Sequence, residues 1–210
     1  LFMVLDKEGF NQWAAQYDQT VAQTQADSQY PFAGYDAVLQ AIETIVAAKP
    51  QPEVLDAGFG TGVLTRRLAG RGARITGFDF ALAMVETVRR QLPQALLFAH
   101  DFNDGWPAVL AEKQFDFIVS TYALHHLSVA GQIAWIQKML SHLKPGGRVL
   151  IGDVAFDNAA ALYACRDQAG ERWDAEEIYL TREQLESVFA QQLQWRRCSF
   201  CAALMSFGAD

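Results

Sequence analysis

The chain has 210 residues, 51% of them hydrophobic, and its 24 acidic and 17 basic side chains give a formal net charge of -7. This length suits one α/β domain with an ample core, and an acidic chain without a Lys/Arg cluster argues against a nucleic-acid partner, which would require a basic face. No apolar run approaches the roughly 20 residues that a bilayer requires, so we expect no membrane span and a cytoplasmic location.

The cysteine pattern suggests a reducing compartment rather than a disulfide framework, because the chain has only Cys165, Cys198 and Cys201. Cys198 and Cys201 form a C-x-x-C, which we place in a strand, where positions i and i+3 face opposite sides. No second pair or nearby histidine completes a zinc site there. We therefore expect free thiols without a metal.

The first fifty residues are predicted to form two helices ahead of the sheet. Phe10, Trp13 and Tyr17 fall at helical spacing, and so does a second run from Tyr35 to Val46. Pro50 stops the second helix. Aromatic stripes at this spacing often belong to a core, and that alternative stays open.

A short apolar strand, Val54–Ala57, leads into the glycine-rich turn Gly58–Gly62 and a helix that begins near Val63. Glycines are needed where a ligand touches the main chain or where φ is positive. A second strand, Arg74–Phe78, delivers Asp79 at its carboxyl end, where an acid can bind both hydroxyls of a ribose. The stretch therefore predicts a nucleotide site.

The glycine spacing distinguishes two kinds of cofactor. A dinucleotide site requires G-x-G-x-x-G, but here the third glycine comes one residue early and Val63 occupies its expected place. Asp56 would repel a pyrophosphate, whereas it could orient a cationic amino group directly or through water. The pattern Asp56-x-Gly58-x-Gly60-x-Gly62 resembles the first motif of class I S-adenosylmethionine (AdoMet) methyltransferases. This resemblance implies that these four residues and Asp79 bind AdoMet.

The third strand, Ala95–Ala99, ends just before Asp101 and Phe102. In class I methyltransferases an acid at this position accepts a hydrogen bond from the adenine amino group, and an apolar neighbour lies against the ring. Asp101 could instead only begin a turn, a role that Asp often has. We also count Phe80 and Ser120 among the cofactor contacts.

The fourth strand, Phe115–Ser120, continues into the segment 121–127, which is similar to the S-x-x-x-L-H-H-L segment of small-molecule methyltransferases. Its adjacent histidines, His125 and His126, suggest a metal site, but a vicinal pair cannot chelate from one helix face and no Glu-x-x-His partner is visible. We therefore predict no metal and expect these histidines to have a structural or substrate-shaping role.

The rest of the chain is predicted to complete an α/β sheet. Ile133, Ile136 and Leu140 repeat at helical spacing, and the next strand places Asp153 at the carboxyl edge, where ligands gather in open α/β sheets. The other predicted elements are a type II turn at Lys144–Gly147, a strand at Arg148–Val154, a helix at Ala159–Trp173, a helix capped by Thr181 that ends at Phe189, and a hairpin at Leu193–Phe207.

The resemblance extends over nearly the whole chain. W-A-x-x-Y-D-x-T-V at 13–21 and I-V-S-T-Y-A-x-H-H-L at 118–127 resemble a family of small bacterial AdoMet methyltransferases with unassigned substrates. It implies one Rossmann-like domain with helices on both faces of a seven-stranded sheet, of order 3-2-1-4-5-7-6 with the last strand antiparallel. It also implies that residues 1–50 form a helical lid over the core at 51–210, with Trp13, Tyr17 and Tyr30 on its inner face.

The expected function is in-line methyl transfer from AdoMet to a small-molecule acceptor, with S-adenosylhomocysteine as the product. No base is fixed by the sequence; the candidates are Tyr17, Tyr30, Tyr122, His125 and Asp153, and Tyr17 is also expected to contact AdoMet. Two alternatives stay open: a catalytically silent AdoMet-binding protein and an NAD-dependent oxidoreductase. We expect a monomer or homodimer.

Overall fold

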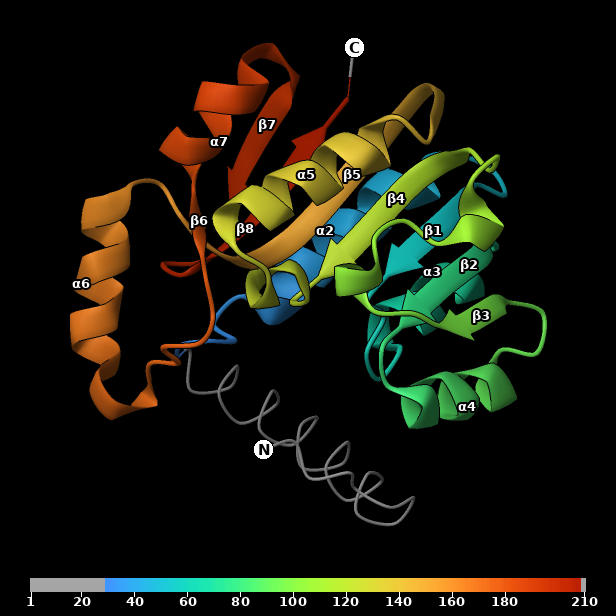
Figure 1. Cartoon of the computed structure of the whole chain (residues 1–210), viewed down its shortest axis with the longest axis horizontal. Coiled ribbons are helices and arrows are strands. Elements are labelled where there is room, and N and C mark those ends of the chain that lie inside the picture. Colours follow the sequence, from blue (N-terminus) through green and yellow to red (C-terminus); the bar gives the residue numbers. More distant parts are fainter. Residues whose placement is uncertain (1–28, 209–210) are drawn as a thin grey trace.

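A mixed β-sheet forms the centre of the molecule in the computed structural model, which describes residues 29–208 (Figure 1). The strands are β1 (Glu53–Ala57), β2 (Arg74–Asp79), β3 (Leu96–Ala99), β4 (Phe115–Thr121), β5 (Leu143–Phe156), β6 (Leu180–Thr181), β7 (Leu193–Arg197) and β8 (Ala202–Phe207). They are ordered β3-β2-β1-β4-β5-β8-β7, and β6 pairs with β5 off this path. Because β8 runs antiparallel to β5, the predicted order is confirmed, with the two-residue β6 as an extra strand.

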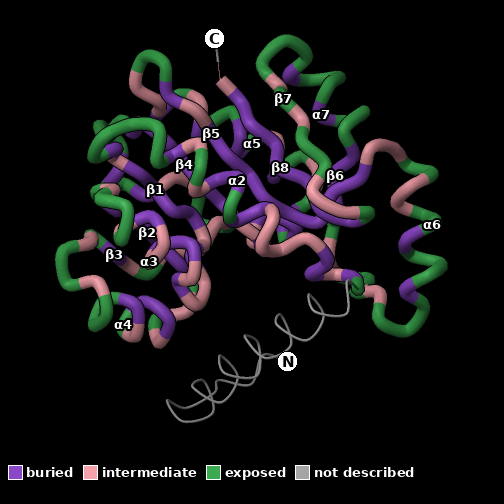
Figure 2. The backbone as a smooth tube through the Cα atoms, turned by 180° about the vertical axis from the view of Figure 1, so that it is seen from behind, coloured by how far each residue is buried: buried purple, intermediate pink, exposed green. Residues whose placement is uncertain are grey.

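Helices cover both faces of the sheet. They are α2 (Tyr35–Ala47), α3 (Val63–Gly70), α4 (Leu82–Gln91), α5 (Val129–Leu140), α6 (Ala159–Ala169) and α7 (Arg182–Phe189). One hydrophobic cluster joins α2, α3 and α4 to one face, and a second joins α5 and α7 to the other. Strands covered on both faces read as continuous apolar runs, and the central strands are buried through the middle of the domain (Figure 2).

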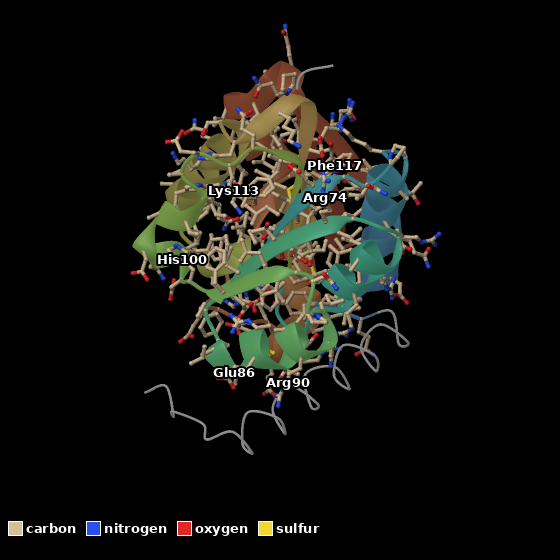
Figure 3. All side chains as sticks on the ribbon, turned by 90° about the vertical axis from the view of Figure 1, so that its right-hand side faces the viewer. Arg74, Glu86, Arg90, His100, Lys113 and Phe117 are labelled. Carbon is tan, nitrogen blue, oxygen red and sulfur yellow. The ribbon has the colours of Figure 1, made fainter. Side chains whose placement is uncertain are left out.

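The edge of the domain at α4 shows how the two sides of a helix differ. Met84, Val85 and Val88 are buried beneath α4, whereas Glu86 and Arg90 lie on its outer face (Figure 3). This is the pattern expected of an amphipathic helix on a sheet. Within residues 29–208, no helix is long and apolar enough to cross a membrane.

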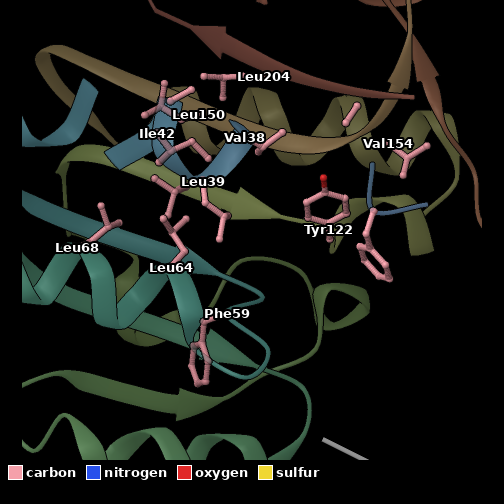
Figure 4. Packing of buried hydrophobic residues seen from close by; sticks show 14 of the residues in the cluster. Val38, Leu39, Ile42, Phe59, Leu64, Leu68, Tyr122, Leu150, Val154 and Leu204 are labelled. Atoms are coloured by element: carbon pink, nitrogen blue, oxygen red, sulfur yellow. The ribbon is translucent and has the colours of Figure 1, made fainter. Parts of the chain in front are cut away.

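Helix α2 is part of the core. Val38, Leu39 and Ile42 are 0% exposed, and they lie close to Leu150 of β5 and Leu204 of β8 (Figure 4). A Cβ at Gly152 of β5 would lie 2.1 Å from a Val38 methyl carbon, so the glycine permits this close approach.

This packing corrects the expectation that both helices before residue 50 belong to a lid. A helix with side chains at 0% exposure cannot leave the sheet without opening the core, so α2 belongs with the core. Trp13 and Tyr17 lie outside the described residues, and the lid remains a prediction for that part of the chain.

Two local predictions at the C-terminal end have different outcomes. Thr181 caps α7 in a capping box with Gln184, as predicted. The C-x-x-C prediction is wrong in position: Cys198 and Cys201 lie in the turn between β7 and β8 rather than in a strand, and Cys198 N–H donates to the Ala202 carbonyl at 2.8 Å. Both residues are free thiols, as is Cys165.

Candidate active site

The predicted site residues that lie within residues 29–208 gather at one edge of the sheet, because parallel strands place their carboxyl ends together. Tyr17 lies outside the described residues. The glycine-rich turn follows β1, and all three glycines have positive φ: 75° at Gly58, 54° at Gly60 and 75° at Gly62. The Gly58 N–H donates to the Phe78 carbonyl at 2.8 Å, which holds the turn against β2. The turn is therefore built from conformations that other residues rarely adopt.

The glycines in this turn serve different purposes. A Cβ at Gly58 would lie 2.7 Å from the Ala123 Cβ and 3.0 Å from the Phe102 ring, so this glycine is required by packing within the protein. A Cβ at Gly60 would meet nothing within 4 Å. Gly60 is therefore the position where the turn is open to a ligand.

Asp79 joins the end of β2 to the glycine turn. One carboxylate oxygen accepts a hydrogen bond from Gly60 N–H at 2.8 Å, and the other accepts one from Ala81 N–H at 2.9 Å. Burial raises the pKa of Asp79, and these two N–H groups partly offset the increase. A carboxylate oxygen has two lone pairs, so each can accept one further bond from a ribose hydroxyl.

Asp56 is more deeply buried than its predicted role requires. It is 0% exposed, and Thr65 Oγ1 donates to its Oδ2 at 2.7 Å. Its other oxygen, Oδ1, has no hydrogen-bond partner among the described residues. Burial raises the pKa of Asp56 to about 7. Contact with an amino group, directly or through a water, stays a prediction for Asp56, and its complete burial favours an intervening water.

The predicted adenine contacts lie at the end of β3, beside the end of β2. His100 N–H donates to the Asp79 carbonyl at 3.0 Å, which joins the two strand ends. The Asp101 Oδ1 atom accepts hydrogen bonds from Asn103 N–H and Nδ2, so the predicted turn is present. Both of these bonds leave Oδ2 able to accept from an amino group. The Phe102 ring packs against Trp135 with centroids 4.8 Å apart, while Phe80 is 65% exposed.

Two of the predicted residues at the end of β4 are held inside the protein. Ser120 is buried, and its hydroxyl donates to the Ala57 carbonyl at 2.8 Å, which ties β4 to β1. Tyr122 has φ of 50°, and its buried hydroxyl has no partner in the described part of the chain. Burial raises the pKa of Tyr122 well above its ordinary value, and the Asp153 charge adds to this effect.

His125 and Asp153 form a buried pair. The two residues are 6% and 4% exposed, and His125 Nδ1 lies 2.6 Å from an Asp153 carboxylate oxygen. Burial lowers the pKa of His125, but the charge and hydrogen bond of Asp153 outweigh it, so the net pKa is raised. The carboxylate therefore holds the imidazole in one orientation with Nε2 facing away from Asp153.

Sequence reasoning missed a polar chain that reaches this pair. Tyr30 OH lies 2.5 Å from Tyr179 OH, the Tyr179 hydroxyl donates to Glu177 Oε2, and Glu177 Oε1 lies 3.4 Å from His125 Nε2. Tyr30 also stacks on Trp173 with centroids 5.0 Å apart. Glu177 and Tyr179 come from the loop after α6, where no motif or periodicity marks them.

The sequence predicted no metal because no further ligand was visible beside the two histidines, but the fold brings Glu177 next to them. His125, His126 and Glu177 each offer one ligand atom, and these atoms lie within 4.8 Å of one another. A Glu-x-x-His partner would lie on the same helix as a histidine, whereas Glu177 reaches the two histidines from another segment.

Fold and site together define a Rossmann-like domain of the class I methyltransferase type. The pattern of a family described as a methyltransferase domain matches residues 54–147. An uncharacterized methyltransferase of Geobacillus kaustophilus is 33% identical over 190 residues, covering 87% of this chain and 85% of that protein. A second, from Geobacillus thermodenitrificans, is 35% identical over 189 residues, with coverages of 86% and 85%. The chain therefore belongs to this family of bacterial methyltransferases.

Solved structures agree with the fold. The DhpI-SAM-HEP complex has a TM-score of 0.66 at 19% identity and covers 95% of this chain and 97% of that one. Magnesium protoporphyrin IX methyltransferase from Synechocystis PCC 6803, with bound SAH, has a TM-score of 0.66 at 17% identity and covers 95% and 93%. The class I methyltransferase family uses AdoMet, and these neighbours were crystallised with it or with its product.

Proposed function

We propose that this protein transfers the sulfonium methyl group of AdoMet to a small-molecule acceptor at the carboxyl edge of the sheet. The observation that carries the proposal is the placement of Asp79: its carboxylate lies at the end of β2, bonded to the turn at Gly60, the glycine that is open to a ligand. The acid can bind the ribose hydroxyls of a nucleoside cofactor beside the open glycine turn. AdoMet fits this arrangement because it has no pyrophosphate and so needs no anion-binding site.

The residues at this edge fit AdoMet. Each Asp79 oxygen retains a lone pair for a ribose hydroxyl, and Asp101 Oδ2 is available to an adenine amino group. Phe80 and Phe102 offer aromatic surface beside these two acids. Asp56 Oδ1 can accept from a water that in turn binds the amino group of the methionine part, because a buried unpaired oxygen favours such a water.

The chemistry requires alignment more than acid catalysis. AdoMet supplies a methyl group on a cationic sulfur, from which a neutral thioether departs. The protein has to hold the cofactor at Asp79 and Asp101, orient the acceptor in line with the methyl group and exclude water. Such alignment is worth up to about 7 to 11 kcal/mol in intramolecular reactions.

The acceptor is proposed to bind where β4 and β5 end. Tyr30, Tyr122, His125 and Asp153 are all buried there, with polar atoms that include the unpartnered Tyr122 hydroxyl. A few buried polar groups suit a small polar molecule better than a polymer, which would need an extended surface. The net charge of -7 further disfavours nucleic acid.

The test is a screen of the purified full chain with AdoMet and small thiols, carboxylic acids, amines and phenols, with S-adenosylhomocysteine as the readout. At least one class should give acceptor-dependent product, and Asp79→Ala should lose most of it. Glu86→Gln, on the outer face of α4 (Figure 3), is the matched control and should retain wild-type turnover. AdoMet binding without product for every class would instead favour the silent binding protein.

A further inference from the structure

His125, His126 and Glu177 converge although they come from two separate segments. The histidines belong to the 3-10 turn η3 (Leu124–His126), which follows β4, and Glu177 lies in the loop between α6 and β6. The Gln132 amide donates to the carbonyls of Leu127 and Ile178, so it ties this loop to the turn. The convergence is therefore fixed by the fold on both sides.

The distances suit metal ligands better than a direct hydrogen bond. His125 Nε2 and Glu177 Oε1 are 3.4 Å apart, which is longer than the about 2.7 to 3.2 Å of an N–H···O bond. Two ligands of a tetrahedral zinc ion with bonds of about 2.0 to 2.1 Å lie about 3.3 Å apart. The third ligand atom, on His126, lies within 4.8 Å of the others. The exposed His126 ring can rotate to shorten that distance.

His125 and Glu177 each also have an outer partner that orients the side chain. Asp153 binds His125 Nδ1 at 2.6 Å, which turns Nε2 toward Glu177. Tyr179 OH donates to Glu177 Oε2, which leaves Oε1 on the side of the histidine. A carboxylate behind a histidine and a hydrogen bond on a ligating carboxylate are the arrangements that orient ligands in metal sites.

We propose that His125, His126 and Glu177 bind one divalent cation of the zinc, cobalt or iron type. Imidazole ligands favour these ions, whereas magnesium and calcium require a shell of oxygen atoms. Two histidines and one carboxylate leave coordination positions for water or a substrate, as in catalytic rather than structural sites. His126 is exposed, which gives the ion a path from solvent.

This site goes beyond methyl transfer and does not depend on it, so its test omits AdoMet. Zinc is titrated by calorimetry into the metal-free full chain, with wild type compared with His126→Ala and Glu177→Gln. Wild type should bind one zinc ion per chain. Loss of an outer partner of a metal ligand lowers metal affinity roughly 10- to 100-fold, and each of the two ligand variants should lower zinc affinity by more than that. Asp153→Asn should fall within that range.

His100→Ala is the matched control, because His100 bonds the Gly105 carbonyl outside the cluster, and its zinc affinity should equal that of wild type. Cobalt gives a second readout, since ligation by nitrogen should produce a visible absorption band that both ligand variants lose. Melting temperatures confirm that the variants fold; His126→Ala alters only an exposed ring. Equal zinc affinity in wild type, His126→Ala and Glu177→Gln, or no binding by any of them, would show that these side chains do not bind zinc and would overturn the proposal.

Discussion

Replacement of Asp79 tests the cofactor site at the point where the structure is most specific. Asp79→Ala removes the proposed acceptor of both ribose hydroxyls. A hydrogen bond to a charged group contributes about 1.5 to 3 kcal/mol. If the net loss equals one such bond, AdoMet affinity should fall roughly 10- to 150-fold, since about 1.4 kcal/mol corresponds to a factor of ten.

The same substitution also affects the free protein. The N–H groups of Gly60 and Ala81, which donate at 2.8 and 2.9 Å, lose their acceptor. Each unpaired buried donor costs about 1 to 3 kcal/mol, and relief of the buried Asp79 charge offsets part of this. Asp79→Ala should therefore also lower the melting temperature.

Asp79→Asn separates the two effects. The amide has the same shape and keeps one acceptor oxygen, but it removes the charge that is proposed to bind ribose. Calorimetric titration of AdoMet and a thermal melt should give Asn an affinity between those of wild type and Ala. Affinities within threefold of wild type for both variants, with both proteins folded, would refute the assignment of Asp79.

Two further predictions follow from the geometry, and a third, on Tyr17, follows from the sequence. Gly60→Ala should weaken AdoMet binding and should destabilise the fold by about 1 to 2 kcal/mol, because it places a side chain at φ of 54°. Gly58→Val should mainly destabilise the fold, so AdoMet titrations and thermal melts distinguish the two variants. Unchanged AdoMet affinity in Gly60→Ala would contradict the proposal that the turn is open to a ligand at Gly60. Because the folded pKa of Asp56 is raised from 3.8 to about 7, its protonated form is favoured in the fold, and stability should be lost as pH rises from about 4 to 7, by at most about 4 kcal/mol. Asp56→Asn should lack this slope in denaturation curves, and parallel curves for the two proteins would contradict the prediction. Tyr17→Phe should lower turnover or AdoMet affinity at unchanged melting temperature if residues 1–28 form the lid, whereas unchanged turnover and affinity would remove the lid's central contact.

The positions of β1 to β4 were predictable because each of these strands is a short, largely apolar run bounded by a turn signal. The placement of Asp79 and Asp101 was predictable for the same reason, since each lies at or just after the end of a strand and needs no knowledge of distant packing. Their contacts with the cofactor stay a prediction. Asp56 shows the limit of that reasoning. Its place in the motif was evident, but its complete burial and its bond to Thr65 of α3 are seen only in the fold.

The remaining features depend on contacts between distant segments. Helix α2 was recognised as a helix, but periodicity shows only that one face is apolar and not that β5 and β8 cover it. Glu177 and Tyr179 lie in a loop without repeat or motif, so only the fold brings them to His125. The turn at Cys198 was missed because its residues continue the apolar pattern of the flanking strands.

Parallel calorimetric titrations of the full chain with AdoMet and with NAD test the central claim most directly. The acid at Asp79 and the open turn at Gly60 suit the ribose of either cofactor, but only a dinucleotide must place a pyrophosphate near the buried Asp56. We predict saturable binding of one AdoMet per chain and no measurable heat with NAD. Saturable binding of NAD without binding of AdoMet would contradict the account.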